Sequence, residues 1–247
     1  MLDSLDTVDL AQSVPLGSLD QFIKPQKPRK RRAKGDGYEF YPTELWVTLA
    51  LLERFSFRGP IWECCCGDGE LAYGLRLRGY DVIASDLIDR GYGTPGIDFL
   101  TKQPKRPFGS IITNPPYKDA AAFVARARQF PGVMVAMYMP LSFCQGAKRT
   151  ENFWPVDPPD LIVTVADRAT MYPRGQEGEN AGMMATAWYI WAGGPPKPGY
   201  DPRMKWLRGG SHKRYAEPTN EIRKILLERY ENFSPVPYLR AVEEAAA

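Results

Sequence analysis

Apolar runs of strand length alternate with helix-like patterns through the middle of the chain. The strand-like runs occupy residues 60–66, 81–86, 97–99, 109–114 and 133–140. The helix-like patterns occupy residues 70–78 and 119–130. Because parallel strands need a crossover connection, usually a helix, this alternation is typical of a parallel sheet with helices on both faces. The sequence therefore predicts an α/β fold.

Two further apolar runs, residues 161–166 and 185–191, are separated by the polar, glycine-containing span 167–184. We expect them to form an antiparallel hairpin that closes the sheet. The expected fold is thus a Rossmann-like, mostly parallel seven-stranded sheet with this closing hairpin and with helices on both faces. Ligands of such sheets bind at the carboxyl ends of the strands, so the residues there are the first candidates for a site.

A glycine turn follows the first predicted strand. Gly67 and Gly69 lie between this strand and the helix-like residues 70–78. Glycine lets the backbone approach a ligand where a Cβ atom would collide, and the N–H groups at the start of a helix favour an anion such as a carboxylate. The turn predicts a site for a nucleotide-like cofactor.

Acidic residues end the next two predicted strands. Asp86 follows the glycine turn by about 20 residues, the spacing at which an acid reaches ribose hydroxyls in doubly wound sheets. Asp98 can accept a hydrogen bond from the exocyclic amine of an adenine, with Phe99 flanking its ring. An ordinary turn carboxylate is the alternative interpretation of Asp98.

The apolar run 109–113 leads directly into Asn114, Pro115, Pro116 and Tyr117. The Asn114 side chain can accept a hydrogen bond, and the two prolines fix the direction of the Pro115 carbonyl. Two acceptors can hold both N–H bonds of a planar amino group and bend its nitrogen toward tetrahedral, while Tyr117 stacks on the ring. The alternative is a simple Pro-Pro turn with a half-buried tyrosine.

These residues together resemble the amino-group methyltransferases that use S-adenosylmethionine, most closely the DNA N6-adenine methyltransferases. In that family the catalytic motif is Asp, Asn or Ser, then Pro-Pro, then an aromatic residue, and Asn114 to Tyr117 match it completely. The family's glycine turn often begins with an acid and proline, whereas this chain has Glu63 followed by Cys64. The resemblance implies a class I methyltransferase fold and S-adenosylmethionine as the cofactor.

An upstream segment, residues 40–44, is similar to the family motif that encloses the methionine part of the cofactor. Glu44 stands where a second proline is common in the family. The resemblance assigns Tyr41 and Thr43 to this role. Thr43 is equally suited to be the N-cap of a helix that begins at Leu45. The cofactor contacts implied by the resemblance are Tyr41, Thr43, Glu63, Cys64, Cys65, Gly67, Gly69, Asp86, Leu87, Asp98, Phe99 and Asn114.

The span between the two hairpin strands is the expected contact with the far face of the target base. Met171 or Tyr172 would fill this role, with Arg168 and Arg174 as phosphate contacts, although a surface aromatic in a loop is the alternative for Tyr172. The short connections after the predicted strands lead us to expect no large target-recognition domain. We therefore expect a short or relaxed recognition sequence, read from the loops 141–158 and 168–183 or from the tail.

Length and composition agree with one substantial domain. The chain has 247 residues, of which 44% are hydrophobic. We expect a disordered segment at 1–36, a catalytic domain at 37–195, and a C-terminal extension with a helix at 196–247. With no long apolar run and no signal-peptide layout at its start, we expect a soluble cytoplasmic protein, bacterial or virus-encoded, that is a monomer or weak homodimer.

The cysteines and the single histidine argue against a metal site. Cys64, Cys65 and Cys66 are adjacent and Cys144 is remote, so the four cysteines have neither disulfide nor zinc spacing. They are interpreted as small strand residues beneath the cofactor. The only histidine, His212, excludes a site that combines a histidine dyad with a metal. No metal is expected.

A basic stretch precedes the predicted domain. Residues 24–34 contain seven cations and no acid, and such an arm gives salt-sensitive, sequence-independent affinity for nucleic acid. The alternative is a solvated linker. DNA is the expected partner, with RNA as the nearest rival. A protein glutamine-N5 methyltransferase that acts on release factors and a non-catalytic nucleic-acid-binding module are the other hypotheses.

Overall fold

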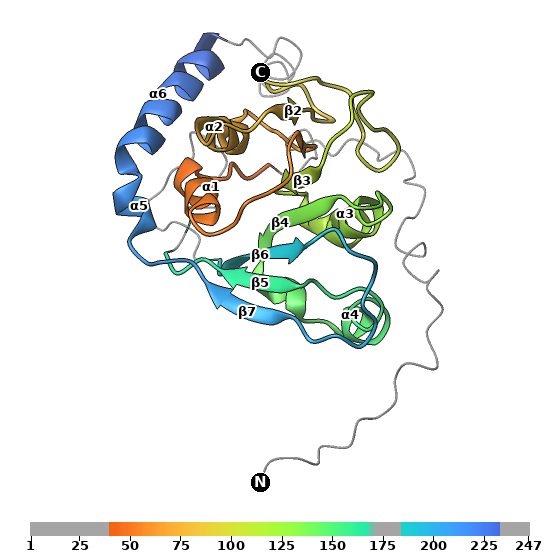
Figure 1. Cartoon of the computed structure of the whole chain (residues 1–247). Coiled ribbons are helices and arrows are strands. Elements are labelled where there is room, and N and C mark those ends of the chain that lie inside the picture. The colour runs from red at the N-terminus through yellow and green to blue at the C-terminus, as the bar shows by residue number, and fades with distance from the viewer. Residues whose placement is uncertain (1–39, 168, 170–183, 233–247) are drawn as a thin grey trace, which may run out of the picture.

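The computed structural model describes residues 40–167, 169 and 184–232. In these residues a seven-stranded sheet has the order β2-β1-β3-β4-β6-β5-β7 (Figure 1). The strands are β1 (Ile61–Glu63), β2 (Val82–Ala84), β3 (Ser110–Thr113), β4 (Met134–Pro140), β5 (Leu161–Thr164), β6 (Thr186–Trp191) and β7 (Arg203–Trp206).

Only β6 reverses the direction of this sheet within the described residues. It is antiparallel to its neighbours β4 and β5, whereas the remaining strand pairs are parallel. The predicted α/β fold, a mostly parallel seven-stranded sheet with an antiparallel hairpin formed by β5 and β6, is confirmed.

Helices cover both faces of the sheet (Figure 1). The helices are α1 (Leu45–Leu52), α2 (Glu70–Leu77), α3 (Ala120–Ala127), α4 (Ala147–Asn152), α5 (Ser211–Arg214) and α6 (Ala216–Asn232), with 3-10 turns at Tyr117–Asp119 (η3) and Leu141–Cys144 (η4). Helices α1 and α2 lie on one face, and α3 lies on the other. Helix α6 packs on the outer side of α1, so α1 is buried between the sheet and a second layer of helix.

The core divides into two clusters because successive strand residues point to opposite faces. Ile61 packs in the cluster beneath α1 and α2, whereas its neighbour Trp62 packs in the cluster beneath α3. Strand β6 repeats the pattern with Trp188 and Tyr189. Both faces of the central strands are therefore buried. This explains why the sequence of these strands is a continuous apolar run rather than an alternation of apolar and polar residues.

The prediction of a strand at residues 97–99 is wrong. This segment is a turn, in which the Asp98 carboxylate accepts from the Leu100 N–H at 3.0 Å, and only an isolated bridge joins Ser85 to Thr94. The side chain of Asp98 competes with the ladder for backbone donors, as aspartate does in turns. The seventh strand is instead β7, from the C-terminal part of the chain, which pairs in parallel with β5.

Strand and helix ends also differ from the prediction at functionally relevant places. β1 ends at Glu63, so Cys64, Cys65 and Cys66 follow the strand instead of belonging to it. The N-cap of α1 is Glu44, not Thr43. No helix in residues 40–167 or 184–232 is long and apolar enough to cross a membrane.

Gly74, in the middle of α2, packs tightly against α1. A Cβ atom at this position would lie 2.8 Å from Cβ and 2.9 Å from Cγ2 of Thr48, which is fully buried. Overpacking of this kind costs roughly 1–3 kcal/mol, while the higher helix propensity of alanine offsets at most about 1 kcal/mol. The close approach therefore requires glycine.

We predict that Gly74→Ala lowers the free energy of unfolding by roughly 1–2 kcal/mol in urea denaturation. Gly194→Ala is the matched control because nothing lies within 4 Å of its added Cβ atom. A Gly74→Ala variant as stable as the wild type would show that α1 and α2 can move apart.

Candidate active site

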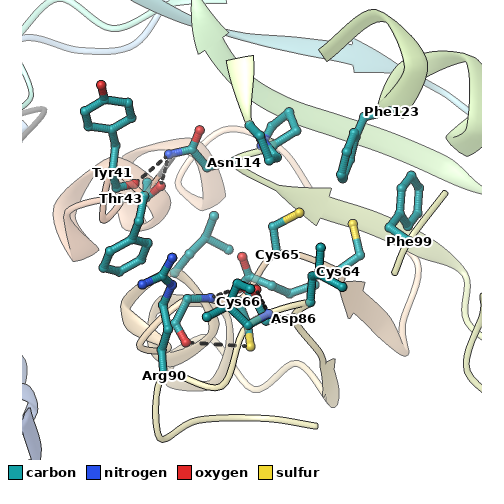
Figure 2. A pocket seen from close by; sticks show the side chains of 18 of the residues that line it. Tyr41, Thr43, Cys64, Cys65, Cys66, Asp86, Arg90, Phe99, Asn114 and Phe123 are labelled. Atoms are coloured by element: carbon teal, nitrogen blue, oxygen red, sulfur yellow. Dashed lines mark hydrogen bonds between the residues drawn. The ribbon is translucent and has the colours of Figure 1, made fainter. Parts of the chain in front are cut away.

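A cavity lies at the carboxyl ends of β1, β2 and β3, the edge at which ligands bind in such sheets (Figure 2). The space that it encloses together with its open mouth is about 1150 Å³. Of the predicted residues, its lining includes Tyr41, Thr43, Glu63, Cys64, Cys65, Gly67, Asp86, Leu87, Asp98, Phe99, Asn114, Pro115 and Pro116. Gly69 and Tyr117 are not in the lining.

The glycine turn after β1 has a backbone conformation that favours glycine. Gly67 and Gly69 both have positive φ, at 54° and 97°, which favours glycine. A Cβ atom on Gly67 would lie 2.4 Å from the Phe40 ring, and one on Gly69 would lie 2.6 Å from the Tyr92 ring. Phe40 thus lies against the cavity side of the turn, and Tyr92 packs against Gly69.

Asp86, which follows β2, forms a hydrogen bond with this turn. Its Oδ2 accepts from the Gly67 N–H at 2.8 Å, and its Oδ1 accepts from the Ile88 N–H at 2.9 Å. Burial raises the pKa of the Asp86 carboxyl, and these backbone hydrogen bonds oppose the rise. Asp86 therefore shapes the turn as well as presenting acceptor atoms to the cavity.

Glu63 is a buried carboxylic acid in the cavity wall. Its side chain is 1% exposed, and its Oε2 atom has no hydrogen-bond partner among the described residues. Burial raises the pKa of Glu63 well above its usual range, and the nearby Cys64, Asp86 and Asp68 raise it further. An acceptor kept in this state fits a ligand that brings a cation, such as the ammonium group of an amino acid.

The three adjacent cysteines line the same cavity as thiols. Burial raises the pKa of Cys65 and of Cys66 above the ordinary value, so neither thiol has the lowered pKa of a reactive cysteine. Cys66 donates weakly to the Tyr92 carbonyl at 3.5 Å. In the described residues no group of three or more histidine, cysteine or acidic side chains has the arrangement of a metal site.

Phe99 forms an aromatic wall on the other side of the cavity. Its ring stacks on that of Phe123, with centroids 5.0 Å apart, and tilts against Trp62. Asp98 lies beside it, with one oxygen committed to the Leu100 N–H. The turn therefore presents an acid next to an aromatic face, although no strand carries it.

Asn114 is held by the segment that precedes α1. Its Nδ2 donates to the Tyr41 carbonyl at 2.9 Å and to Thr43 Oγ1 at 3.0 Å (Figure 2). These two acceptors define which end of the carboxamide is nitrogen, so Oδ1 is on the side away from them. The result is a fixed hydrogen-bond acceptor at the cavity, at the carboxyl end of β3.

Tyr117 lies beside the cavity in η3 and is stacked on Tyr41. The two ring centroids are 5.8 Å apart and the planes differ by 13°. The Pro116 carbonyl accepts from the Asp119 N–H at 3.0 Å and closes the turn. The upstream segment thus contacts the tetrapeptide three times, through the carbonyl and the ring of Tyr41 and through the hydroxyl of Thr43.

Other predicted residues lie outside the described part of the chain. These are Arg168, Met171, Tyr172, Arg174 and the basic stretch 24–34.

Sequence reasoning also missed several residues of the lining. Arg90 lies over the Phe40 ring at 4.2 Å from its centroid, and Phe123, Lys118 and Glu70 line the cavity as well. Their positions next to the tetrapeptide and the glycine turn were the available signal for the last three.

No family model and no curated protein matches the sequence. Several solved structures are similar in fold. A candidate class I S-adenosylmethionine-dependent methyltransferase from Listeria monocytogenes is 16% identical with a TM-score of 0.46, over 72% of this chain and 69% of that chain. The 23S rRNA methyltransferase ErmE is 19% identical with a TM-score of 0.43, over 74% and 78%.

A modification subunit of a candidate type I restriction enzyme from Vibrio vulnificus is 12% identical with a TM-score of 0.44, over 77% of this chain and 55% of that chain. All three identities are below 20% and all three TM-scores are below 0.5. These likenesses therefore assign neither a family nor an activity to the chain.

Glu63 makes the stability of the ligand-free protein depend on pH. Because its folded pKa is raised above the ordinary 4.5, the stability that the protonated acid allows is fully present below 4.5 and is lost as the pH rises through the folded pKa. Glutamine in its place cannot ionise. We predict that Glu63→Gln stabilises the protein relative to the wild type, and more at about pH 8 than at about pH 5.

Urea denaturation at both pH values measures this difference. Glu151→Gln is the control because Glu151 is exposed on α4. The prediction is contradicted if Glu63→Gln loses stability relative to the wild type as the pH rises.

Proposed function

We propose that the protein transfers a methyl group from S-adenosylmethionine to the N6 amino group of adenine in DNA, with short or relaxed sequence specificity. The single observation that carries this proposal is the fixed carboxamide of Asn114, whose nitrogen is held by Tyr41 and Thr43 at the edge of the cavity. An immobilised acceptor is what a weakly nucleophilic amino group requires.

The tetrapeptide acts on the target amino group. Asn114 Oδ1 accepts one N–H and the Pro115 carbonyl accepts the other, which draws the nitrogen lone pair out of conjugation and aims it into the cavity. The stacked pair Tyr41 and Tyr117 supports the target ring. The N–H proton that the amino group gives up on methylation passes to water, so no strong base is required of these residues. Positioning and oriented dipoles supply the acceleration, and alignment alone reaches roughly 7–11 kcal/mol.

The cavity fits the proposed cofactor. When bound, S-adenosylmethionine supplies an electrophilic methyl group on a sulfonium sulfur. Glu63, with its unpartnered buried oxygen, would accept from the ammonium of the methionine part. Asp86 would accept from the ribose hydroxyls and Asp98 from the adenine amine, while Phe99 flanks the adenine ring.

A nucleic acid is the proposed substrate because the sequence carries a basic arm at residues 24–34. The target adenine would be extruded from the helix to reach the cavity. An RNA adenine and the glutamine of a release factor offer the same planar amino group, so the assay includes both.

The direct test is methyl transfer from labelled cofactor to DNA, RNA or a release factor, with identification of the methylated atom. We expect N6-methyladenine in DNA, and we expect Asn114→Ala to lower turnover by roughly 100- to 1,000-fold, the cost of removing one preorganised polar contact in other enzymes.

A matched control keeps this experiment interpretable. Asn152→Ala is the matched substitution, because Asn152 lies on α4 away from the cavity. Label in RNA or in the release factor would replace the proposed substrate. Full turnover by Asn114→Ala would remove the carboxamide from the mechanism.

Cofactor binding tests the second half of the proposal. Asp86→Ala removes the ribose acceptor and also frees the Gly67 N–H, so we expect the dissociation constant for S-adenosylmethionine to rise. Loss of a hydrogen bond to a charged group costs about 1.5–3 kcal/mol, which corresponds to a rise in the dissociation constant of roughly 10- to 150-fold. Isothermal titration calorimetry measures it.

Asp201→Ala is the control for this measurement, because Asp201 is an exposed carboxylate outside the cavity lining. An Asp86→Ala variant with wild-type affinity would exclude Asp86 from the cofactor site.

A further inference from the structure

Arg223 of helix α6 contacts the segment that holds Asn114. Arg223 forms an ion pair with Glu44 Oε1, and its Nε lies 3.8 Å from Glu70 Oε1. We infer that Arg223 is a positioning residue of the active site: it fixes residues 43–45 and thereby the direction of the Asn114 carboxamide. This inference rests on the proposed function for its kinetic consequence, but its structural part does not.

The two acids that Arg223 bridges are both buried. Glu44 is 7% exposed and Glu70 is 2% exposed. Glu44 Oε2 accepts from Trp46 Nε1 at 2.8 Å, and Glu70 Oε1 accepts from the Leu45 N–H at 3.0 Å. The start of α1 is therefore tied to α2 and to α6 by charged hydrogen bonds, which are stronger than neutral ones.

The same few residues also orient the catalytic amide. Thr43 directly precedes Glu44, and its hydroxyl accepts from Asn114 Nδ2 at 3.0 Å. The Tyr41 carbonyl, two residues earlier, is the second acceptor. A movement of Glu44 by a fraction of a hydrogen-bond length is thus passed to both groups that hold the carboxamide.

The apolar contacts of α6 bring Arg223 to this place. Ile222 and Leu226 of α6 pack with Leu45 and Leu49 of α1 in one cluster. Arg223 follows Ile222 in sequence, so packing of the helix delivers the guanidinium to the buried acids. The side chain of Arg223 is 28% exposed, which leaves it partly reachable by water.

Removal of this cation leaves two buried carboxylates close together. Like charges at such a site repel each other, and removal of one partner of a buried ion pair is strongly unfavourable. We expect Glu44 to move toward water in response and so reduce this repulsion, because it lies in the segment that begins α1. The unusual glutamate at this position of the upstream motif thus has a specific structural partner.

The test uses Arg223→Gln, with Lys224→Gln as the matched control on the same helix. Lys224 is exposed and loses the same charge. We expect Arg223→Gln to lower kcat by roughly 10- to 100-fold, as misplacement of catalytic groups does, with a smaller change in KM for the cofactor. Lys224→Gln should keep the wild-type kcat.

A double variant separates charge from packing. Glu44→Gln removes the buried charge that Arg223 neutralises and keeps an acceptor for Trp46, so Glu44→Gln combined with Arg223→Gln should recover most of the lost kcat. Arg223→Lys keeps the charge and should retain more activity than Arg223→Gln. If Arg223→Gln alone does not fold, the double variant and Arg223→Lys provide the answer.

A second readout is independent of catalysis. The side-chain NH2 signal of Asn114 in a 15N NMR spectrum is identified by its absence from Asn114→Ala. We expect this signal to shift and its protons to exchange faster in Arg223→Gln, but not in Lys224→Gln. If the wild type methylates nothing, this signal still tests the positioning role.

The inference is overturned if Arg223→Gln keeps both the kcat and the Asn114 signal of the wild type. It is also overturned if the double variant is no more active than Arg223→Gln, since the effect would then not pass through Glu44.

Discussion

The hydrogen bonds that Asn114 donates to Tyr41 and Thr43 are the constraint on which the site depends. They join the end of β3 to a segment that precedes it by 73 and 71 residues. Such a long-range contact stays in register only if both sides are rigid. β3 is paired on both edges, and α1 is buried between the sheet and α6, so the fold supplies that rigidity.

The cavity concentrates acids that a protein selected for stability alone would avoid. Glu63 and Asp86 both have pKa values raised by burial, and the buried Asp68 and Glu70 also line the cavity. Groups of this kind cluster at functional sites because the same desolvation that costs stability strengthens contacts to a ligand. A cofactor with a cationic amino-acid part would relieve part of this strain.

Elements with a local sequence signal can be predicted from the sequence. Prediction fails where a contact with a residue far away in the sequence determines the structure. Buried strands, the glycine turn and the acid Asp86 all follow from neighbouring residues. The strand at 97–99 fails because the Asp98 side chain competes for backbone donors. β7 alternates polar and apolar residues, a strand signal, yet only its pairing with β5 reveals its role. Likewise, no local pattern connects Arg223 with Glu44, because packing of α6 brings them together.

The carboxamide of Asn114 is oriented by two neutral acceptors, a peptide carbonyl and a hydroxyl. Neither of them gains or loses a proton in the range where a protein of this kind is folded. A carboxylate in the same place would change its hydrogen-bonding character with acidity. These two contacts therefore add no acidity dependence of their own, and any acidity dependence of the chemistry must arise from other groups.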